Sequence, residues 1–341
     1  MGGDRLFGAR KYQALSYKEA GGRSRGNLHL IRAAEAKPAI NQEVLLLRVG
    51  VIDIGTNSTR YLLADVDSQS LLRVETALRP TRLGEGLATS GRLSEQAMAR
   101  TAAAIAEFWR RAQAMGAEEI IAAATSAVRE ALNREDFLVL IRQATGLTVR
   151  VLTETEEARY TFRGVLTGLT FDPEKTVVVD IGGGSTEIAW VEKRRLRTQS
   201  LPLGAVRLTE QGADVKAIDE LLAPVVSKIA GRRLVGSGGT ITTLAAVALG
   251  LPVYDPERVH GYELRRETVA AIGARLAELS LTERQRVPGL QPERADIILA
   301  GIQILSILLA RTGATGLTVS EHDLLYGLAA EAISGVEIKL D

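Results

Sequence analysis

Three consecutive glycines follow a buried strand in the segment VVVDIGGGSTE, from Val177 to Glu187. The valines predict a strand that is buried on both faces. Glycine loses backbone entropy on folding, so a triple glycine indicates a turn whose N–H groups meet a ligand such as a phosphate group without a Cβ in the way. Asp180 and Glu187 flank this turn and are suited to hold a divalent cation or a water molecule against that phosphate. A tight glycine-rich hairpin with incidental carboxylates is the alternative interpretation.

The same pattern occurs earlier in the chain, as VGVIDIGTNST from Val49 to Thr59. Two strand–Asp–Ile–Gly turns far apart in the sequence indicate two domains of similar build rather than a solenoid. If the two turns face each other across a cleft, they form a clamp for a chain of phosphates. The predicted substrate-binding residues are therefore those of the two turns: Gly55, Thr56, Asn57 and Ser58 in the first, and Gly182, Gly183, Gly184 and Ser185 in the second.

The composition is that of an ordinary globular protein with room for two domains. The chain has 341 residues, of which 46% are hydrophobic and 24% charged, and its net charge is +1. This charge does not predict a nucleic-acid partner. The absence of cysteine excludes disulfides, thiolate metal sites and a thiol nucleophile. The longest apolar run, Ile297 to Ala310, is too short for a membrane span, and no secretory pattern is present, so we expect a cytoplasmic protein without a membrane partner.

The order of elements predicts an α/β fold with two mixed sheets, each covered by helices on both faces. The first sheet is expected to contain five strands, at Val44–Asp53, Thr59–Val66, Leu71–Leu78, Ile120–Ala124 and Val149–Leu152. The second is also expected to contain five, at Thr176–Asp180, Thr186–Glu192, Leu196–Leu203, Arg233–Val235 and Leu317–Val319. The predicted domains are 43–171, completed by a C-terminal helix in 321–341, and 172–320. Residues 1–42 are expected to be a flexible extension or the product of a start codon assigned too early, and a basic tail for nucleic acid is the alternative.

Several further residues are candidates for binding anions. Arginine meets phosphate oxygens two at a time. Arg60 follows the first turn, Arg129 follows the polar turn after strand 120–124, and Arg82 lies in the RLGEGL loop. Arg82 and Arg129 are the preferred clamps. Gly238 and Gly239 belong to a second glycine-rich turn before a helix, where an anion site and close packing are equally good interpretations. The basic run 193–197 is predicted to be a solvated hairpin tip. His260 is expected to serve packing or capping, and the role of His322 is undecided.

Eight segments in order resemble the exopolyphosphatase / guanosine pentaphosphate phosphatase family in its short two-domain form. They are VGVIDIGTNSTRYLLADV, RLGEGL, ATSAVREALN, EEAR, VVVDIGGGSTEIAW, LPLGAVRLTE, VGSGGTITTLAA and ERADIILAGIQIL. The resemblance implies two duplicated actin-like (ribonuclease H-like) domains around an interdomain cleft, and a homodimer. The ending SEHDLLYGL departs from the SxxGLREG of many members. Leu325 and Tyr326 stand where Arg and Glu are common, which leaves a substrate contact from that helix without support.

The resemblance also implies a reaction, which is the release of orthophosphate from inorganic polyphosphate by attack of water on the terminal phosphoanhydride. Removal of the 5′-phosphate of guanosine pentaphosphate (pppGpp) is the alternative. Glu157 matches the family's catalytic base, although the residues alone favour a role in complementing the helix dipole, and Glu187 is expected to share the catalytic task. Asp180, with Asp53 and Glu187, is expected to hold Mg²⁺ or Mn²⁺.

Two hypotheses from other classes stay open at this point. The first is an ATP-dependent kinase of the same superfamily, whose GSGGT turn would hold adenosine. The second is a non-catalytic sensor of polyphosphate or (p)ppGpp. A glutamate that orients water beside the terminal phosphate argues against both, because a kinase must exclude water and a pure binding protein does not activate it.

Overall fold

The computed structural model describes residues 46–67, 70–212 and 214–332. The predictions for residues 1–42, and for the end of the C-terminal helix beyond residue 332, lie outside the described residues. Among the helices of the described part, none has both the length and the apolar character that crossing a bilayer requires.

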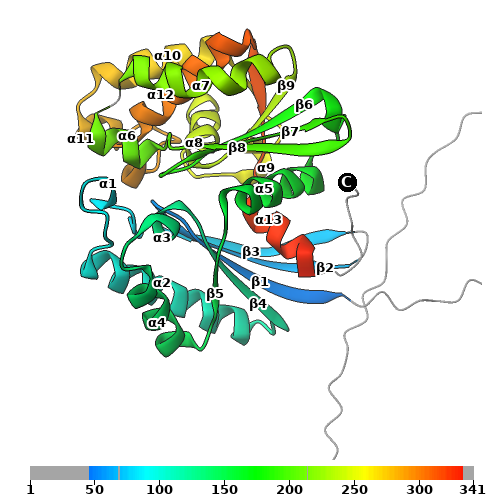
Figure 1. The fold of residues 1–341 in the computed structure, drawn as a ribbon, viewed down its shortest axis with the longest axis vertical. Coiled ribbons are helices and arrows are strands. Elements are labelled where there is room, and N and C mark those ends of the chain that lie inside the picture. The colour runs from blue at the N-terminus through cyan, green and yellow to red at the C-terminus, as the bar shows by residue number, and fades with distance from the viewer. Residues whose placement is uncertain (1–45, 68–69, 213, 333–341) are drawn as a thin grey trace, which may run out of the picture. The chain divides into compact units, whose positions relative to one another are not determined.

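The first sheet has five strands, as predicted, in the order β3 (Leu71–Arg79), β2 (Thr59–Val66), β1 (Leu47–Ile54), β4 (Glu119–Ala124) and β5 (Val149–Val151). β1, β2 and β3 form an antiparallel meander, and β4 and β5 run parallel to β1. α2 (Glu95–Ala114) and α4 (Arg134–Thr145) cover one face, where Ile54, Phe108 and Phe137 share a core (Figure 1). Ser94 caps α2, because its side chain accepts a hydrogen bond from Ala97 N.

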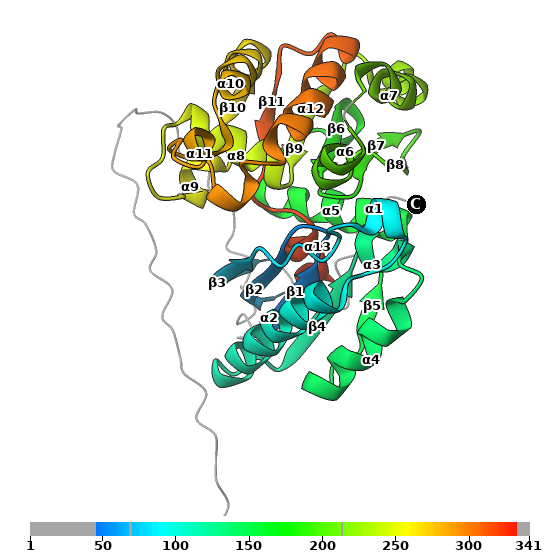
Figure 2. The same cartoon turned by 90° about the vertical axis from the view of Figure 1, so that its left-hand side faces the viewer.

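The second sheet has six strands, one more than predicted. Their order is β10 (Glu263–Arg265), β11 (Gly316–Val319), β9 (Arg233–Ser237), β6 (Thr176–Ile181), β7 (Thr186–Glu192) and β8 (Arg195–Leu201). β10 was missed because its three residues are too few to show alternation of apolar and polar side chains, and pairing with β11 creates the strand. The face away from the first sheet carries α6 (Ala205–Gln211), α7 (Val215–Ile229), α8 (Gly239–Ala248), α10 (Arg266–Glu278) and α12 (Ile298–Thr312) (Figure 2).

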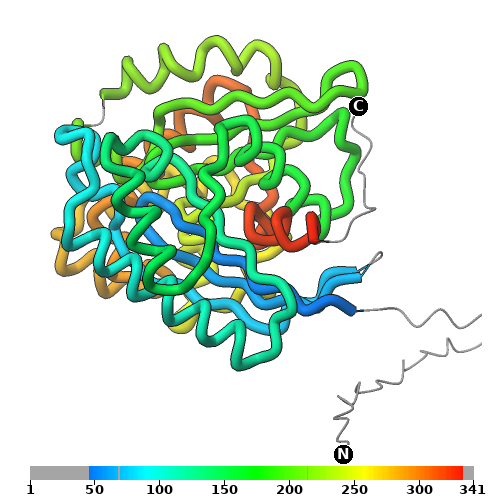
Figure 3. The backbone as a smooth tube through the Cα atoms, turned by 60° about the horizontal axis from the view of Figure 1, so that its bottom comes forward, coloured from blue at the N-terminus to red at the C-terminus, as the bar shows by residue number. Residues whose placement is uncertain are grey.

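Two helices lie between the sheets: α5 (Glu154–Gly168) and α13 (Leu324–Ala329) (Figures 1 and 2). α5 packs Phe162 and Val165 against the second sheet, and α13 packs Leu325 and Tyr326 against β1 and β2 (Figure 3). The helices approach closely because each has a glycine at the crossing. A Cβ on Gly164 would overlap backbone atoms of Asp323, and a Cβ on Gly327 would overlap those of Tyr160.

The predicted helix 321–333 begins later than expected, at Leu324. The side chain of Asp323 accepts a hydrogen bond from Leu325 N at 3.1 Å and so caps the helix there. After Ala329 the chain continues as a short 3₁₀ turn, η3 (Ala330–Ala332). The remaining short elements are α1 (Leu87–Ser90), α3 (Ser126–Glu130), α9 (Pro256–Val259), α11 (Leu281–Arg284), η1 (Pro173–Lys175) and η2 (Pro292–Arg294).

We call the five-stranded sheet with its helices the first lobe, and the six-stranded sheet with its helices the second lobe. The predicted boundaries at residues 171 and 320 stay a prediction, but the two sheets are built from 47–151 and 176–319 without exchange of strands. The two aspartate-bearing strands, β1 and β6, occupy equivalent places, each paired with the next strand in an antiparallel hairpin.

Candidate active site

The two glycine turns have the same pattern of backbone hydrogen bonds. Gly55 N donates to Ser58 O at 3.1 Å, and Gly182 N donates to Ser185 O at 3.0 Å. The loop after the third strand of each lobe then donates to the turn, from Gly84 N to Thr56 O and from Val206 N to Gly183 O, both at 2.9 Å. These bonds occupy the carbonyl groups. Within the described residues the N–H groups of Thr56, Asn57, Gly183 and Gly184 donate to no protein acceptor, and they remain available to a ligand.

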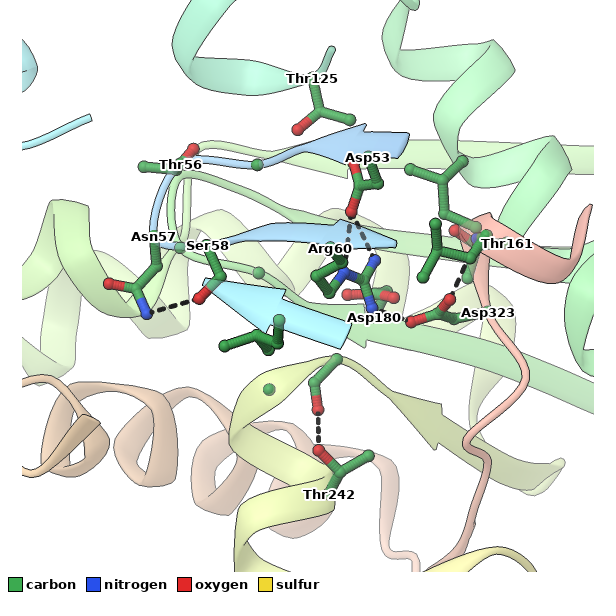
Figure 4. Close-up of a pocket in the computed structure, with 18 of the residues that line it drawn as sticks. Asp53, Thr56, Asn57, Ser58, Arg60, Thr125, Thr161, Asp180, Thr242 and Asp323 are labelled. Atoms are coloured by element: carbon green, nitrogen blue, oxygen red, sulfur yellow. Dashed lines mark hydrogen bonds and ion pairs between the residues drawn. The ribbon is translucent and has the colours of Figure 1, made fainter. Parts of the chain in front are cut away.

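The two turns face each other. A Cβ on Gly183 would lie 3.1 Å from Thr56 Cβ and 3.2 Å from Asn57 N, and a Cβ on Gly184 would overlap the Ser126 hydroxyl. Only glycine permits this approach of the lobes. A cavity of about 350 Å³ opens beside the paired turns (Figure 4). All ten predicted binding residues of the glycine-rich turns line it: Gly55, Thr56, Asn57, Ser58, Gly182, Gly183, Gly184, Ser185, Gly238 and Gly239.

The lobes differ chemically at the position opposite each strand aspartate. Asp53 is paired across the hairpin with Arg60, whereas Asp180 is paired with Glu187. Arg60 Nε and Nη2 donate to Asp53 Oδ2 at 2.8 and 2.7 Å, and Arg60 Nη1 binds Asp323 (Figure 4). Burial raises the pKa of Asp53, and Arg60 opposes that rise. The first lobe therefore neutralises its aspartate, and the second lobe places a second carboxylate beside it.

The two carboxylates of the second lobe, Asp180 and Glu187, both have raised pKa values. Asp180 accepts a hydrogen bond from Ser237 Oγ at 2.8 Å, and burial together with Asp323 raises its pKa to about 6. Glu187 accepts from Ser200 Oγ at 2.8 Å, and burial together with Asp180 raises its pKa to about 7. Both groups thus favour the protonated form more than a solvent-exposed carboxylate does.

Glu157 points into the cavity from the first turn of α5 and is only 9% exposed. Burial and the charge of Glu187 raise its pKa well above the ordinary value. Arg129 Nη1 donates to Glu157 Oε2 at 2.9 Å and to Leu152 O at 2.8 Å, which fixes the carboxylate. The neighbouring Glu156 caps the helix instead, accepting from Thr153 N at 2.8 Å. Glu156 therefore supplies the cap, and Glu157 lies in the charged first turn of α5 with its side chain at the cavity.

Two of the three predicted metal ligands, Asp53 and Asp180, fit a cation that keeps most of its water. Among the described residues no three or more His, Asp or Glu side chains are arranged as a ready-made metal site. However, Asp53 Oδ1 is buried without a hydrogen-bond partner, and Asp53 and Asp180 both line the cavity. Mg²⁺ commonly takes one or two carboxylates and several waters, so this donor set suits it. Glu187 does not line the cavity.

The structure does not place the two preferred arginine clamps in the cavity. Arg82 binds Asp296 at 2.8 Å and Glu293 O at 3.0 Å, which ties the lobes together, and Arg129 is occupied by Glu157. The arginines that line the cavity are Arg60, Arg73 and Arg294. The last two are hard to find from sequence, since Arg294 lies in the ERADIILAG segment and Arg73 lies within a strand.

The position of Arg294 bears on the two interpretations of Gly238 and Gly239, an anion site and close packing. A Cβ on Gly239 would overlap the Arg294 guanidinium, so the glycine is needed for close packing. Arg294 Nε donates to Gln291 at 2.8 Å, and its guanidinium forms no ion pair with a carboxylate within the described residues. Burial lowers its pKa to about 10. A buried cation at the positive end of α8 is unfavourable by itself. An anion in the cavity would offset the charge of the guanidinium and that of the helix N-terminus.

The other singled-out residues have structural roles. His260 Nδ1 accepts from Glu321 N at 3.1 Å, and His260 Nε2 lies 3.1 Å from Gly168 O, as expected for a packing residue. His322 stacks on Tyr326 with ring centroids 3.7 Å apart. Lys193 and Arg194 form the tip of the β7–β8 hairpin with positive φ angles of 51° and 63°, so the basic run is an exposed turn, as predicted.

Comparison with known proteins agrees with this geometry. The profile of the Ppx/GppA phosphatase family matches residues 62–331. Exopolyphosphatase 2 of Mycobacterium tuberculosis is 34% identical over 83% of this chain and 98% of its own length. The crystal structure of the Aquifex aeolicus family member is 34% identical, with a TM-score of 0.71 over 84% of this chain and 98% of that one. An exopolyphosphatase from Cytophaga hutchinsonii is 26% identical, with a TM-score of 0.78 over 85% of this chain and 99% of that one. The chain therefore belongs to the Ppx/GppA phosphatase family.

Proposed function

We propose that this protein releases orthophosphate from the end of inorganic polyphosphate chains. As a member of the Ppx/GppA phosphatase family, the chain is a phosphoanhydride hydrolase. The observation that carries the proposed hydrolysis of a terminal phosphoanhydride is the pair of facing glycine turns, whose unoccupied N–H groups border one cavity together with Glu157. Arg60, Arg73 and Arg294 add positive charge to this cavity. The similarity to an exopolyphosphatase over nearly its whole length supports the proposal.

We propose distinct tasks for the two sides of the cavity. The N–H groups of the turns would bind the oxygens of the terminal phosphoryl group and stabilise the charge that develops on them. Glu157 would accept a proton from the attacking water, with Arg129 holding one carboxylate oxygen so that Oε1 can face that water. The water oxygen bonds to the terminal phosphorus as the bridging P–O bond breaks, and the shortened chain leaves.

We also propose that Mg²⁺ or Mn²⁺ serves this reaction, held by Asp180 and by the unpartnered Oδ1 of Asp53. Such a cation would offset the negative charge of the phosphates. It would also relieve the repulsion between carboxylates that now favours their protonated forms. A cation at this place is consistent with the raised pKa values of Asp180 and Glu187.

The cation proposal predicts a pH-dependent effect on stability. The pKa values of Asp180 and Glu187 rise from 3.8 and 4.5 to about 6 and about 7 in the fold. The native state therefore binds these protons more tightly than the unfolded chain, and the resulting stabilisation, complete below pH 4, is lost as the pH rises to about 7. Mg²⁺ binds the ionised form, so we expect it to raise the melting temperature of the substrate-free protein by about 5 °C at pH 8 and by much less at pH 5.

Thermal unfolding with and without Mg²⁺ tests this prediction. Asp180→Asn should remove most of the Mg²⁺-induced shift at pH 8. Asp136→Asn, at an exposed aspartate of α4, is the matched control and should keep the shift. An equal shift at both pH values, or a shift retained by Asp180→Asn, would place the cation elsewhere.

Product analysis tests the proposed reaction itself. Long-chain polyphosphate, tripolyphosphate and pppGpp should be supplied side by side with Mg²⁺ and without a phosphate acceptor. We expect orthophosphate from polyphosphate, with pppGpp as the second candidate because it presents the same terminal anhydride. Phosphate transfer that requires an added acceptor would favour the kinase hypothesis. Tight binding of polyphosphate without release of phosphate would favour the sensor hypothesis.

A further inference from the structure

The edge strand of the first sheet, β3, contains a β-bulge close to the cavity. Leu63 of β2 pairs with Glu75, but the next residue, Ala64, pairs with Arg73, so Val74 has no partner. A bulge of this kind turns the following side chains to the other face of the sheet and commonly redirects a residue near an active site.

The bulge moves Arg73 from the α2 face of the sheet to the cavity face. Glu75, on one side of the bulge, binds Arg111 of α2. On the other side Arg73 lies opposite Ala64, which belongs to the core formed with α13. With regular alternation, Arg73 would share a face with Glu75. The register shift instead gives it the same face as Thr76 and Leu78, and all three line the cavity.

At this place Arg73 is paired with a carboxylate of the second lobe. Its guanidinium forms an ion pair with Glu257 of α9 and lies near Tyr326 of α13. Tyr326 also lines the cavity and is held on its ring face by His322. The side chain of Arg73 is 28% exposed and that of Glu257 is 77% exposed. An ion pair this exposed contributes little to stability and is easily exchanged for another anion.

We propose that Arg73 binds a phosphate of the substrate chain well behind the one that is cleaved, in exchange for Glu257. This inference rests on the proposed function. Leu78 pairs with Arg60, next to the strand aspartate, and Arg73 pairs with Ala64, four residues further along β2. At roughly 3.4 Å per residue the separation along the sheet is about 14 Å. A long polyphosphate held by the glycine turns and leaving along β3 would reach Arg73, whereas a short chain would end before it.

The proposal also gives a role to the unusual residue at the start of α13. Tyr326 is a neutral neighbour of the guanidinium and does not offset its charge. A glutamate at this position would form a second ion pair with Arg73 and compete with phosphate. A neutral neighbour therefore suits an arginine that must exchange one anion for another.

Steady-state phosphate release with long polyphosphate and with tripolyphosphate tests the assignment. We expect Arg73→Gln to raise KM for long chains about tenfold, as for loss of one charge-assisted hydrogen bond, with a much smaller change for tripolyphosphate. Glu257→Gln removes the competing anion and should lower KM for long chains. Arg79→Gln is the matched control, since Arg79 lies on the same strand but binds the exposed Glu107 outside the cavity.

The signs of the two effects separate a substrate contact from a structural one. If the pair only ties the lobes together, Arg73→Gln and Glu257→Gln will change KM in the same direction, and the proposal is wrong. It is also overturned if Arg73→Gln and Arg79→Gln have equal KM values. Calorimetric titration of long polyphosphate into Arg73→Gln and Arg79→Gln gives the same comparison without turnover. If the wild-type protein binds polyphosphate but releases no phosphate, the proposed function is wrong. The calorimetric comparison of Arg73→Gln with Arg79→Gln then still tests whether Arg73 binds the chain.

Discussion

Replacement of Glu157 by glutamine is expected to lower kcat about 10³-fold, within the range attributed to a general base, while KM for polyphosphate stays nearly unchanged. Glutamine has the size of glutamate and retains a carbonyl oxygen that can accept the hydrogen bond from Arg129. It cannot accept a proton from the attacking water. The loss therefore falls on the transition state rather than on ground-state binding.

Glu154, three residues before Glu157, supplies the control. Glu154 lies in the same first turn of α5 and is exposed, so Glu154→Gln changes the charge near the helix N-terminus without touching the cavity. It should turn over like the wild type. Steady-state rates of phosphate release give kcat, and a titration of polyphosphate into the protein gives the affinity. Normal turnover by Glu157→Gln would show that Glu157 is not the catalytic base.

The pH dependence of the wild type bears on the same assignment. Burial raises the pKa of Glu157, with a further contribution from Glu187. A base must be ionised to act, so activity falls as the pH drops through that raised pKa. A bound cation opposes the rise by stabilising the carboxylate forms. The acid limb of the rate profile and the Mg²⁺ concentration should therefore be linked, and this linkage connects the catalytic and cation proposals through one cluster of buried charges.

Local sequence predicted the parts of the site that depend on backbone conformation. The Asp–Ile–Gly turns follow strands with clear hydrophobic patterns, and their glycines have a direct steric cause, the approach of Gly183 to Thr56 and Asn57. The duplicated turns also predicted that both would border one cavity. This worked because turn chemistry is encoded within a few neighbouring residues.

The arginines could not be assigned in the same way. An arginine is available to the substrate only if no carboxylate of the protein already pairs with it. The carboxylates that pair with Arg82 and Arg129 are distant from them in the sequence. Arg82 is occupied by Asp296 and Arg129 by Glu157, whereas Arg294 has no such partner within the described residues. Arg73 depends on a single unpaired residue in β3. Each outcome is decided by tertiary packing, which the order of residues along the chain does not display.

Replacement of Gly184 by alanine is expected to lower kcat/KM about 10² to 10³-fold, the range found on removing one donor to a developing charge. A Cβ at this position would overlap the Ser126 hydroxyl and would lie 2.8 Å from Thr56 Oγ1 and 3.0 Å from Ser126 Cβ. Both partners belong to the first lobe, so relief of the contact must move one turn away from the other. A displacement of about 1 Å is enough to cost 10²-fold in a site that depends on position.

The control is a glycine that also lies close to a neighbour but does not line the cavity. Gly273 lies within α10, where a Cβ would come within 2.9 Å of Ile302 Cγ2, and it does not line the cavity. Gly273→Ala tests whether a tight Cβ anywhere impairs the enzyme, and we expect near-normal turnover. Melting temperatures for both variants separate loss of folding from loss of catalysis.

A compensating substitution makes this test specific to the meeting of the two turns. Ser126→Gly in the Gly184→Ala background removes the hydroxyl and Cβ that the new methyl group would strike, so part of the lost kcat/KM should return. The gain must exceed the effect of Ser126→Gly alone, since only then do the two positions interact across the lobes. If Gly184→Ala has normal kcat/KM, the turns do not act together on one phosphoryl group, because a clamp that tolerates a methyl group between its two sides is not closed on its substrate.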